Sequence, residues 1–104
     1  MAQWTAAEVS LSDTSEQTLV AAPGSGRAIA VHLIFGSNAG ASLSTVSFKD
    51  GATARFKPSM AANGGGFAVP FPRMWILAPG NALKVSQSAS VVSSVSAVYE
   101  IVIP

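Results

Sequence analysis

The stretch RAIAVHLIF, residues 27–35, decides the fold class because its side chains divide into two sets at every second residue. A strand places successive side chains on opposite faces, whereas a helix repeats about every 3.6 residues. Strict alternation puts Ile29, Val31, Leu33 and Phe35 on one face and Ala28, Ala30, His32 and Ile34 on the other. β-Branched and aromatic residues dominate the stretch, as is typical of strands. We therefore expect a long strand that is apolar on both faces.

The same period of two continues along the chain, and no segment shows the periodicity of an amphipathic helix. STVSFK (residues 44–49) alternates Val46 and Phe48 with Ser47 and Lys49, and SSVSAVYEIVI (residues 93–103) alternates again. Turn signals separate the segments at Pro23-Gly24-Ser25-Gly26, Asp50-Gly51 and Pro79-Gly80-Asn81. Further short strands are expected near residues 8–11, 18–21, 54–57, 67–71, 75–77 and 83–85. This spacing predicts an all-β chain of about eight short strands, a sandwich or barrel.

Length and composition bound the possibilities further. At 104 residues the chain has room for one domain, residues 1–104, with residues 1–6 as an extended N-terminal arm. Only 11% of residues are charged, less than half the roughly 25% of an average domain. Such a surface favours coverage by further copies, a homo-oligomer; a Ser-, Thr- and Ala-rich monomer surface is the alternative. The net charge of +1 and the lack of a long apolar run predict neither nucleic acid nor membrane as partner.

Two strands, residues 27–35 and the C-terminal one, carry apolar residues on both faces. In a two-layer sandwich one of those faces points outwards and would ordinarily be polar. The predicted subunit interface therefore consists of Ala28, Ala30, His32, Ile34, Val98 and Val102. The alternative is that small outward-facing apolar residues are ordinary surface.

The stretch NGGGFAVPFP (residues 63–72) puts three glycines before an apolar segment that two prolines interrupt. A phosphate-binding loop needs its glycines at the start of a helix, and no helix follows here. We therefore expect a loop or tight turn. Pro70 and Pro72 cannot donate to a fully paired central strand, so the segment after the turn is expected at a sheet edge.

Few residues could carry chemistry. The absence of cysteine excludes disulfides and thiolate metal sites, and His32 is the only histidine. One histidine cannot build a histidine-rich metal site, and no Gly-x-Ser-x-Gly elbow accompanies it. Nothing in the five acidic residues indicates a glycosidase pair. We expect no enzyme activity, no catalytic residue, no metal and no cofactor.

Positive charge flanks one predicted hairpin and the proline-rich segment. A basic patch with neighbouring aromatic residues suits the carboxylates of a protein partner. The predicted protein-interaction residues are Lys49, Arg55, Lys57, Phe67, Phe71, Arg73 and Trp75. The alternative is that these are solvated hairpin residues.

The order of AVHLIFGSN, STVSFKDGA, GGGFAVPFP, WILAPGNALKV and a final strand ending in VYEIVI resembles small bacteriophage virion proteins of jelly-roll type. The resemblance covers residues 27–103 and is greatest to capsid decoration (cement) proteins. It implies a single-domain antiparallel β-sandwich of jelly-roll type that binds the outer capsid surface as an oligomer, a trimer in such families. The major capsid protein would be its partner.

Tail-fibre, head-fibre and baseplate modules contain similar short sandwiches. Recognition of a host receptor or glycan is therefore the alternative function, with Trp4, Trp75 and Tyr99 as the aromatic platform. The start MAQWTAAEVS lacks the basic and apolar regions of a signal peptide, so we expect synthesis in the host cytoplasm.

Overall fold

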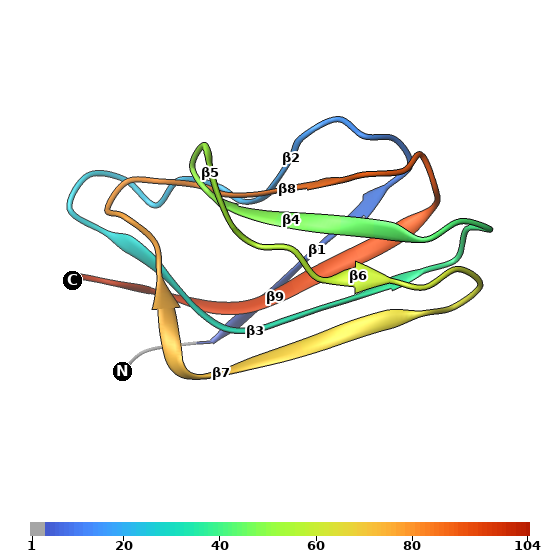
Figure 1. The fold of residues 1–104 in the computed structure, drawn as a ribbon. Helices are drawn as coiled ribbons and strands as arrows, with labels where there is room; N and C mark the ends of the chain where they lie inside the picture. The colour runs from blue at the N-terminus through green and yellow to red at the C-terminus, as the bar shows by residue number, and fades with distance from the viewer. Residues whose placement is uncertain (1–3) are drawn as a thin grey trace.

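The computed structural model describes residues 4–104, which form nine strands in two layers (Figure 1). In chain order the strands are β1 (Thr5–Leu11), β2 (Gln17–Val20), β3 (Ala28–Asn38), β4 (Ser44–Asp50), β5 (Thr53–Phe56), β6 (Ser59–Met60), β7 (Gly66–Ile76), β8 (Leu83–Gln87) and β9 (Ser93–Val102). The first sheet has the order β1-β9-β3-β7. The second has the order β2-β8-β4-β5, with β6 paired to β4. Residues 4–104 contain no helix of the length and hydropathy needed to cross a membrane.

The strand pairing follows the jelly-roll order, in which a long double ribbon is rolled into two sheets. β1 pairs with β9, β2 with β8, β3 with β7 and β4 with β5, all antiparallel. The all-β, jelly-roll sandwich expected from the sequence is thereby confirmed, with the two-residue β6 as an addition. Of the expected N-terminal arm, residues 1–3 lie outside the described residues, and Thr5 and Ala6 belong to β1.

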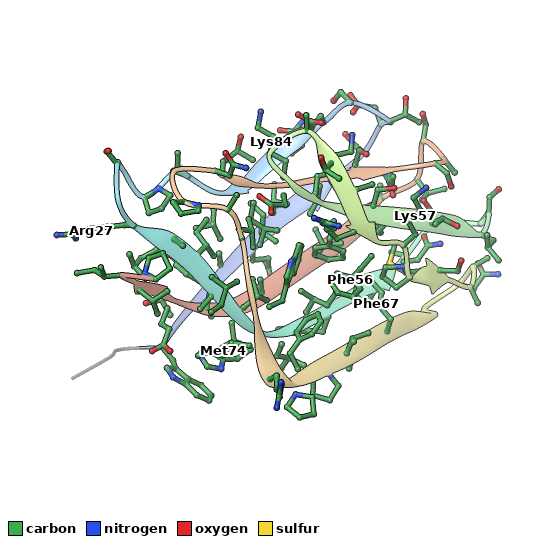
Figure 2. The ribbon with its side chains drawn as sticks, turned by 60° about the vertical axis from the view of Figure 1, so that its left-hand side comes forward. Arg27, Phe56, Lys57, Phe67, Met74 and Lys84 are labelled. Atoms are coloured by element: carbon green, nitrogen blue, oxygen red, sulfur yellow. The ribbon has the colours of Figure 1, made fainter. Side chains whose placement is uncertain are left out.

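Apolar side chains from both layers fill the space between the sheets. Phe48 of β4 is fully buried and meets Phe67 of β7 edge to face, with ring centroids 5.7 Å apart. Figure 2 shows Phe67 among the side chains that fill this space. β4 and β9 keep the expected alternation, since Val46, Val95 and Ala97 belong to the same core. The period of two therefore predicted the inward face of these two strands.

β3 departs from strict alternation at His32. Val31 pairs with Tyr99 of β9, and the next β9 residue, Val98, pairs with Leu33. His32 is thus an extra residue without a β9 partner, which defines a β-bulge. A bulge shifts the phase of every side chain that follows it, because side chains alternate with a period of two.

The bulge reverses the face assignment of the second half of β3. Ile34, expected on the outer face, is fully buried in the core, whereas Phe35, expected in the core, is 38% exposed. Leu33 lies on the outer face with Phe35. The sequence prediction for these three residues is wrong because it assumed one uninterrupted register.

β7 is a single bent strand, although two shorter strands were expected here. Trp75 pairs with Val31 and Pro70 pairs with Leu33, so residues 71–74 lie opposite the one residue His32. In Figure 1 the strand turns sharply at this point and continues towards the second layer. β7 forms one edge of the first sheet, which confirms the edge position expected from its prolines.

The glycine run at the start of β7 contributes to a tight turn that docks on the end of β3, with Gly64 in the turn and Gly66 as the first residue of the strand. The N–H of Asn63 donates to the carbonyl of Gly40 at 2.8 Å, and the N–H of Gly64 donates to that of Asn38 at 2.6 Å. Asn63 and Gly64 both have positive φ, at 60° and 98°. A side chain on Gly66 would collide with the Gly36 carbonyl. These amides serve a structural turn, as the sequence predicted.

A buried glutamine closes one end of the sandwich. Gln87 of β8 accepts hydrogen bonds from the hydroxyls of Ser44 at 3.2 Å and Ser93 at 2.8 Å. Its amide donates to the carbonyls of Asp13 at 3.2 Å and Val91 at 2.7 Å. Gln87 therefore joins both sheets and the β1–β2 connection through one fully satisfied side chain.

Candidate functional site

Most of the predicted protein-interaction residues gather where β5 and β7 form neighbouring edges of the two sheets. We call this surface the β5–β7 side. Arg55 lies on β5, Lys57 directly follows β5, and Arg73 lies at the bend of β7, all with exposed side chains. Within residues 4–104 the only ion pairs involve other side chains. These three cations therefore remain available to a partner.

Aromatic rings bridge the gap between β5 and β7. The ring of Phe56 lies 5.1 Å from that of Phe71 and 4.8 Å from that of Trp75, measured between centroids, at steep interplanar angles. All three are half-buried against the core. A hollow of about 400 Å³ beside them is lined by Asp50, Arg55, Phe56, Trp75 and Ile76. Partly exposed tryptophan, phenylalanine and arginine form the composition that is enriched in protein interfaces.

The carboxylate of Asp50 in this hollow is already engaged. It accepts hydrogen bonds from the N–H of Ala78 at 3.1 Å and from the side-chain amide of Asn81 at 2.9 Å. Gly51 and Gly80 have positive φ, as the predicted Asp50-Gly51 and Pro79-Gly80-Asn81 turns require. Asp50 therefore ties two turns together, and the β5–β7 side keeps a positive balance because three cations, Arg55, Lys57 and Arg73, outnumber this one carboxylate.

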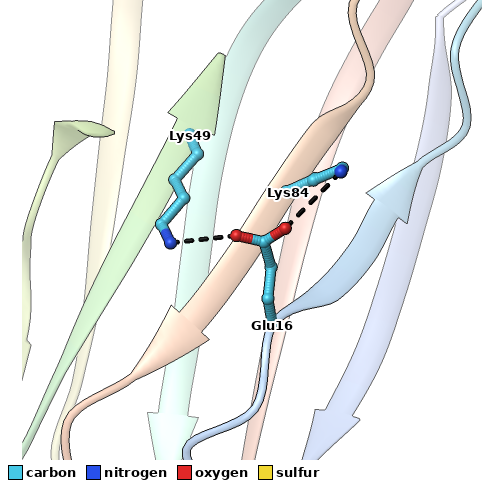
Figure 3. Close-up of polar contacts among 3 residues, drawn as sticks. All are labelled: Glu16, Lys49 and Lys84. Carbon is cyan, nitrogen blue, oxygen red and sulfur yellow. Dashed lines mark hydrogen bonds and ion pairs between the residues drawn. The ribbon is translucent and has the colours of Figure 1, made fainter. Parts of the chain in front are cut away.

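Lys49 and Phe67 do not join the β5–β7 side. Phe67 packs against Phe48, and the ammonium of Lys49 lies 2.9 Å from the Glu16 carboxylate, which Lys84 approaches to 3.5 Å (Figure 3). Mainly through the hydrogen bond from Lys49, this arrangement lowers the pKa of Glu16 below its ordinary value. Lys49 is thus neutralised within its own chain.

The Glu16 cluster makes stability depend on pH in the acid range. Because the pKa of Glu16 is lower in the folded chain, its ionised form stabilises the fold above the ordinary carboxyl range, and this contribution is lost as pH falls through the folded value. We expect Glu16→Gln to lower the unfolding temperature modestly at pH 7 and to have no effect near pH 2. Thermal unfolding followed by circular dichroism from pH 2 to 7 measures this. An equal effect of Glu16→Gln at both ends of the range would contradict the assignment.

The residues of the predicted subunit interface belong to β3 and β9 of the first sheet, and all of them except Ile34 lie on its outer face. Ala28 and Ala30 are fully covered within the chain, and Ile34 belongs to the core. His32, Val98 and Val102 are partly exposed. Three of the six predicted residues are therefore partly accessible, and the other three are covered within the chain.

A hollow of about 640 Å³ lies on this outer face, beside the bend of β7. It is lined by Trp4, His32, Leu33, Phe71, Pro72, Met74 and Val98. The contribution of Leu33 was not predicted because of the bulge, and that of Met74 was not predicted because the bend was expected to be a break between strands. The prolines and the lack of alternation after Pro70 were the signal that β7 folds back here.

His32 lies in this hollow between an indole and a carboxylate. The Trp4 ring stacks on the imidazole with centroids 3.7 Å apart and an interplanar angle of 19°, and Trp4 remains 61% exposed. On its other side Nε2 of His32 lies 3.3 Å from Oε1 of Glu100, and both side chains are largely buried. Neither Nε2 of His32 nor the second oxygen of Glu100 makes a hydrogen bond within residues 4–104. The bulge thus places His32 beside a carboxylate, at 3.3 Å.

The described residues do not assemble a metal site. Among residues 4–104 no three His, Asp or Glu side chains form a group that could hold a metal ion. His32 and Glu100 lie beside each other, and the remaining acids lie on the edge strand β1, in the connection from β1 to β2 and at the end of β4.

The sequence matches no known protein family and no curated protein. Solved structures with a similar fold include the acid-stable capsid of Helicobacter pylori bacteriophage KHP30, at 13% identity, a TM-score of 0.59, and coverage of 98% of this chain and 97% of that chain. The virus-like particle of extra small virus from the giant freshwater prawn Macrobrachium rosenbergii is similar at 13% identity and a TM-score of 0.53, covering 97% of this chain and 76% of that chain.

A protein outside viruses also has this fold. The nucleoplasmin-like N-terminal domain of Drosophila FKBP39 is similar at 5% identity and a TM-score of 0.58, with 96% of this chain and 90% of that chain covered. At these identities the likeness concerns the fold alone. The chain thus has a jelly-roll sandwich whose structural neighbours include viral capsid proteins.

Proposed function

We propose that this chain is a structural virion protein without enzymatic activity, and more specifically a decoration (cement) protein on the outer surface of a phage capsid. The observation that carries the proposal is the end-to-end likeness to the KHP30 capsid chain, since each chain is covered almost completely by the other. The sequence resemblance to decoration proteins and the low share of charged residues support it. The finer role, with the major capsid protein as partner and a trimer as the assembly, rests on that resemblance.

The exposed apolar surface supplies the means of attachment. Trp4, Phe35, Met74 and Ile76 are each 38% exposed or more, and all lie on the outer face of the first sheet or at its margin. Covering apolar surface contributes about 25 cal/mol per Å². Repeated over many copies, such contacts resist rupture of a shell through avidity, with each single contact remaining weak.

Purified shells of the phage that encodes the chain, prepared without it, provide the direct test. We expect added protein to co-sediment with the shells at a fixed ratio to the major capsid protein and to raise the temperature at which the shells rupture. Imaging of the loaded particle should place the protein on the outer surface. Absence of co-sedimentation, or a location confined to the tail, would remove the proposal.

A second candidate function has one specific observation in its favour. Trp4 is 61% exposed at the rim of the larger hollow, where an indole can stack on a sugar ring. A fibre or baseplate module that binds a host glycan would show a change of indole fluorescence on addition of host polysaccharide. Trp4→Phe should abolish that change, whereas Trp75→Phe, at the half-buried indole, should preserve it.

A further inference from the structure

The two sides of the sandwich differ in the charge that they leave available. The sheet orders place β1 and β2 at one side and β5 and β7 at the opposite side. We call the former the β1–β2 side. Glu16 is ion-paired with two lysines, and Glu100 lies beside His32. Asp50 is only partly exposed and accepts hydrogen bonds from turn amides. The other two acids, Glu8 on β1 and Asp13 in the β1–β2 connection, are exposed without an ion pair in residues 4–104. One oxygen of Asp13 accepts hydrogen bonds from the N–H and the hydroxyl of Ser15, and these neutral donors leave the charge of the carboxylate in place.

The available cations lie on the opposite side. Lys49 and Lys84 are bound to Glu16, which leaves four of the six cationic residues. Three of these, Arg55, Lys57 and Arg73, are exposed on the β5–β7 side. The fourth, Arg27, projects from one end of the sandwich (Figure 2). Among the exposed side chains of residues 4–104 that carry a charge without an ion pair, the two acids thus lie on one side and three of the four cations on the other.

We propose that the β1–β2 side of one copy binds the β5–β7 side of the next copy, head to tail. The partner is a second copy because the chain itself supplies both complementary surfaces, and it has few other charges with which to do so. Complementary charges orient two surfaces and fix their register, while like charges in contact disfavour the wrong pairing. Glu8 and Asp13 would face Arg55, Lys57 and Arg73 across the contact.

The chemistry of the two sides also fixes how they meet. Pro70 and Pro72 lack the N–H groups needed to extend a sheet, so β7 cannot accept β1 of a neighbour as a regular further strand. The contact is therefore made by side chains, with the half-buried Phe71 and Trp75 at its centre and the arginines at its rim. On β1 the partly buried Val9 supplies apolar surface opposite them.

A head-to-tail contact joins two different surfaces, so it generates a ring when the rotation between successive copies closes. Three copies would give the trimer of the proposed function. The inference rests on the proposed function only in the statement that such a ring would bind to a capsid. The contact itself is a property of the isolated protein and can be measured without one.

Charge exchange between the two sides tests the contact. Glu8→Lys with Asp13→Asn makes the acidic side cationic, and Arg55→Glu with Arg73→Glu makes the cationic side acidic. Each pair alone places like charges in contact, so we expect self-association to weaken about tenfold or more in analytical ultracentrifugation. Combining all four changes in one chain restores opposite charges, and self-association should recover. A mixture of the two double variants should also associate.

Two controls distinguish loss of this contact from unfolding and from a general effect of charge. Arg27→Glu reverses an exposed cation outside both sides and should leave self-association unchanged, and circular dichroism should show that each variant is folded. Failure of the four-fold variant to recover, or a wild-type protein that stays monomeric at about 100 µM, would overturn the inference. If the four-fold variant recovers self-association but the wild-type protein does not bind shells, the inferred contact stands and the proposed function is wrong. If the wild-type protein binds shells but the four-fold variant does not recover self-association, the proposed function stands and the inferred contact is wrong.

Discussion

Replacing Ile34 with alanine is expected to lower the free energy of unfolding by about 2–5 kcal/mol, whereas Leu33→Ala should cost less than about 1 kcal/mol. Ile34 is fully buried between the sheets, and its truncation would leave a cavity that a close-packed core cannot fill. Leu33 lies on the outer face beside the larger hollow, where its truncation leaves no enclosed void. Urea unfolding of the two variants measures the difference.

The same pair of variants decides whether β3 contains the bulge. Strict alternation from Ile29 would bury Leu33 and expose Ile34, so the order of the two costs would be reversed. Phe35→Ala provides the matched control, because Phe35 is the next residue on the outer face and is 38% exposed. A large cost for both Leu33 and Phe35 would contradict the register described for β3.

Replacing Gln87 with leucine is expected to lower the free energy of unfolding by about 3 kcal/mol. Leucine has nearly the same volume, so the loss arises from hydrogen bonds. The Ser44 and Ser93 hydroxyls and the Asp13 and Val91 carbonyls would each lose a partner where the sheets meet. A buried polar group left without a partner costs about 1–3 kcal/mol, and the contributions of one network do not add fully.

Denaturant unfolding of Gln87→Leu should be compared with that of Ser86→Ala, a neighbouring and only partly buried position on the same strand. The control is expected to stay within about 0.5 kcal/mol of wild type. A Gln87→Leu protein as stable as wild type would mean that hydrophobic packing replaces the network. The assignment of Gln87 as the side chain that joins the two sheets would then be wrong.

Local periodicity predicted most of the fold because most strands keep one register throughout. β9 alternates from Val95 through Ala97 to Tyr99, and this part of its inward face follows directly from the sequence. The prediction is wrong for Ile101, which strict alternation places on the same face but which is 40% exposed near the end of the strand. β3 does not keep one register, and nothing in an apolar run marks His32 as the extra residue. A bulge is set by pairing with β9, more than 60 residues later in the chain, so local sequence carries no signal for it.

The candidate site was predictable where neighbouring residues stay together in space. Phe71, Arg73 and Trp75 are close in sequence, and the bend of β7 keeps them on the side that β5 brings next to them. Lys49 was expected with them because it precedes the same hairpin. Lys49 instead lies on the outer face of the second sheet, where its ammonium group contacts the Glu16 carboxylate. Only the pairing of β2, β8 and β4 brings that acid near.

The pairing of β1 with β9 has a consequence for how the chain is made. β1 is the first of the nine described strands to be synthesised, and its only strand partner within residues 4–104 is the last of the nine. At roughly 5–20 residues per second, β1 waits for several seconds before the first sheet can be completed. The first sheet is therefore completed only after β9 has been synthesised, and non-local pairing of this kind makes folding slow. The nascent protein passes through that interval with a strand edge exposed, at which chaperones or further copies can bind.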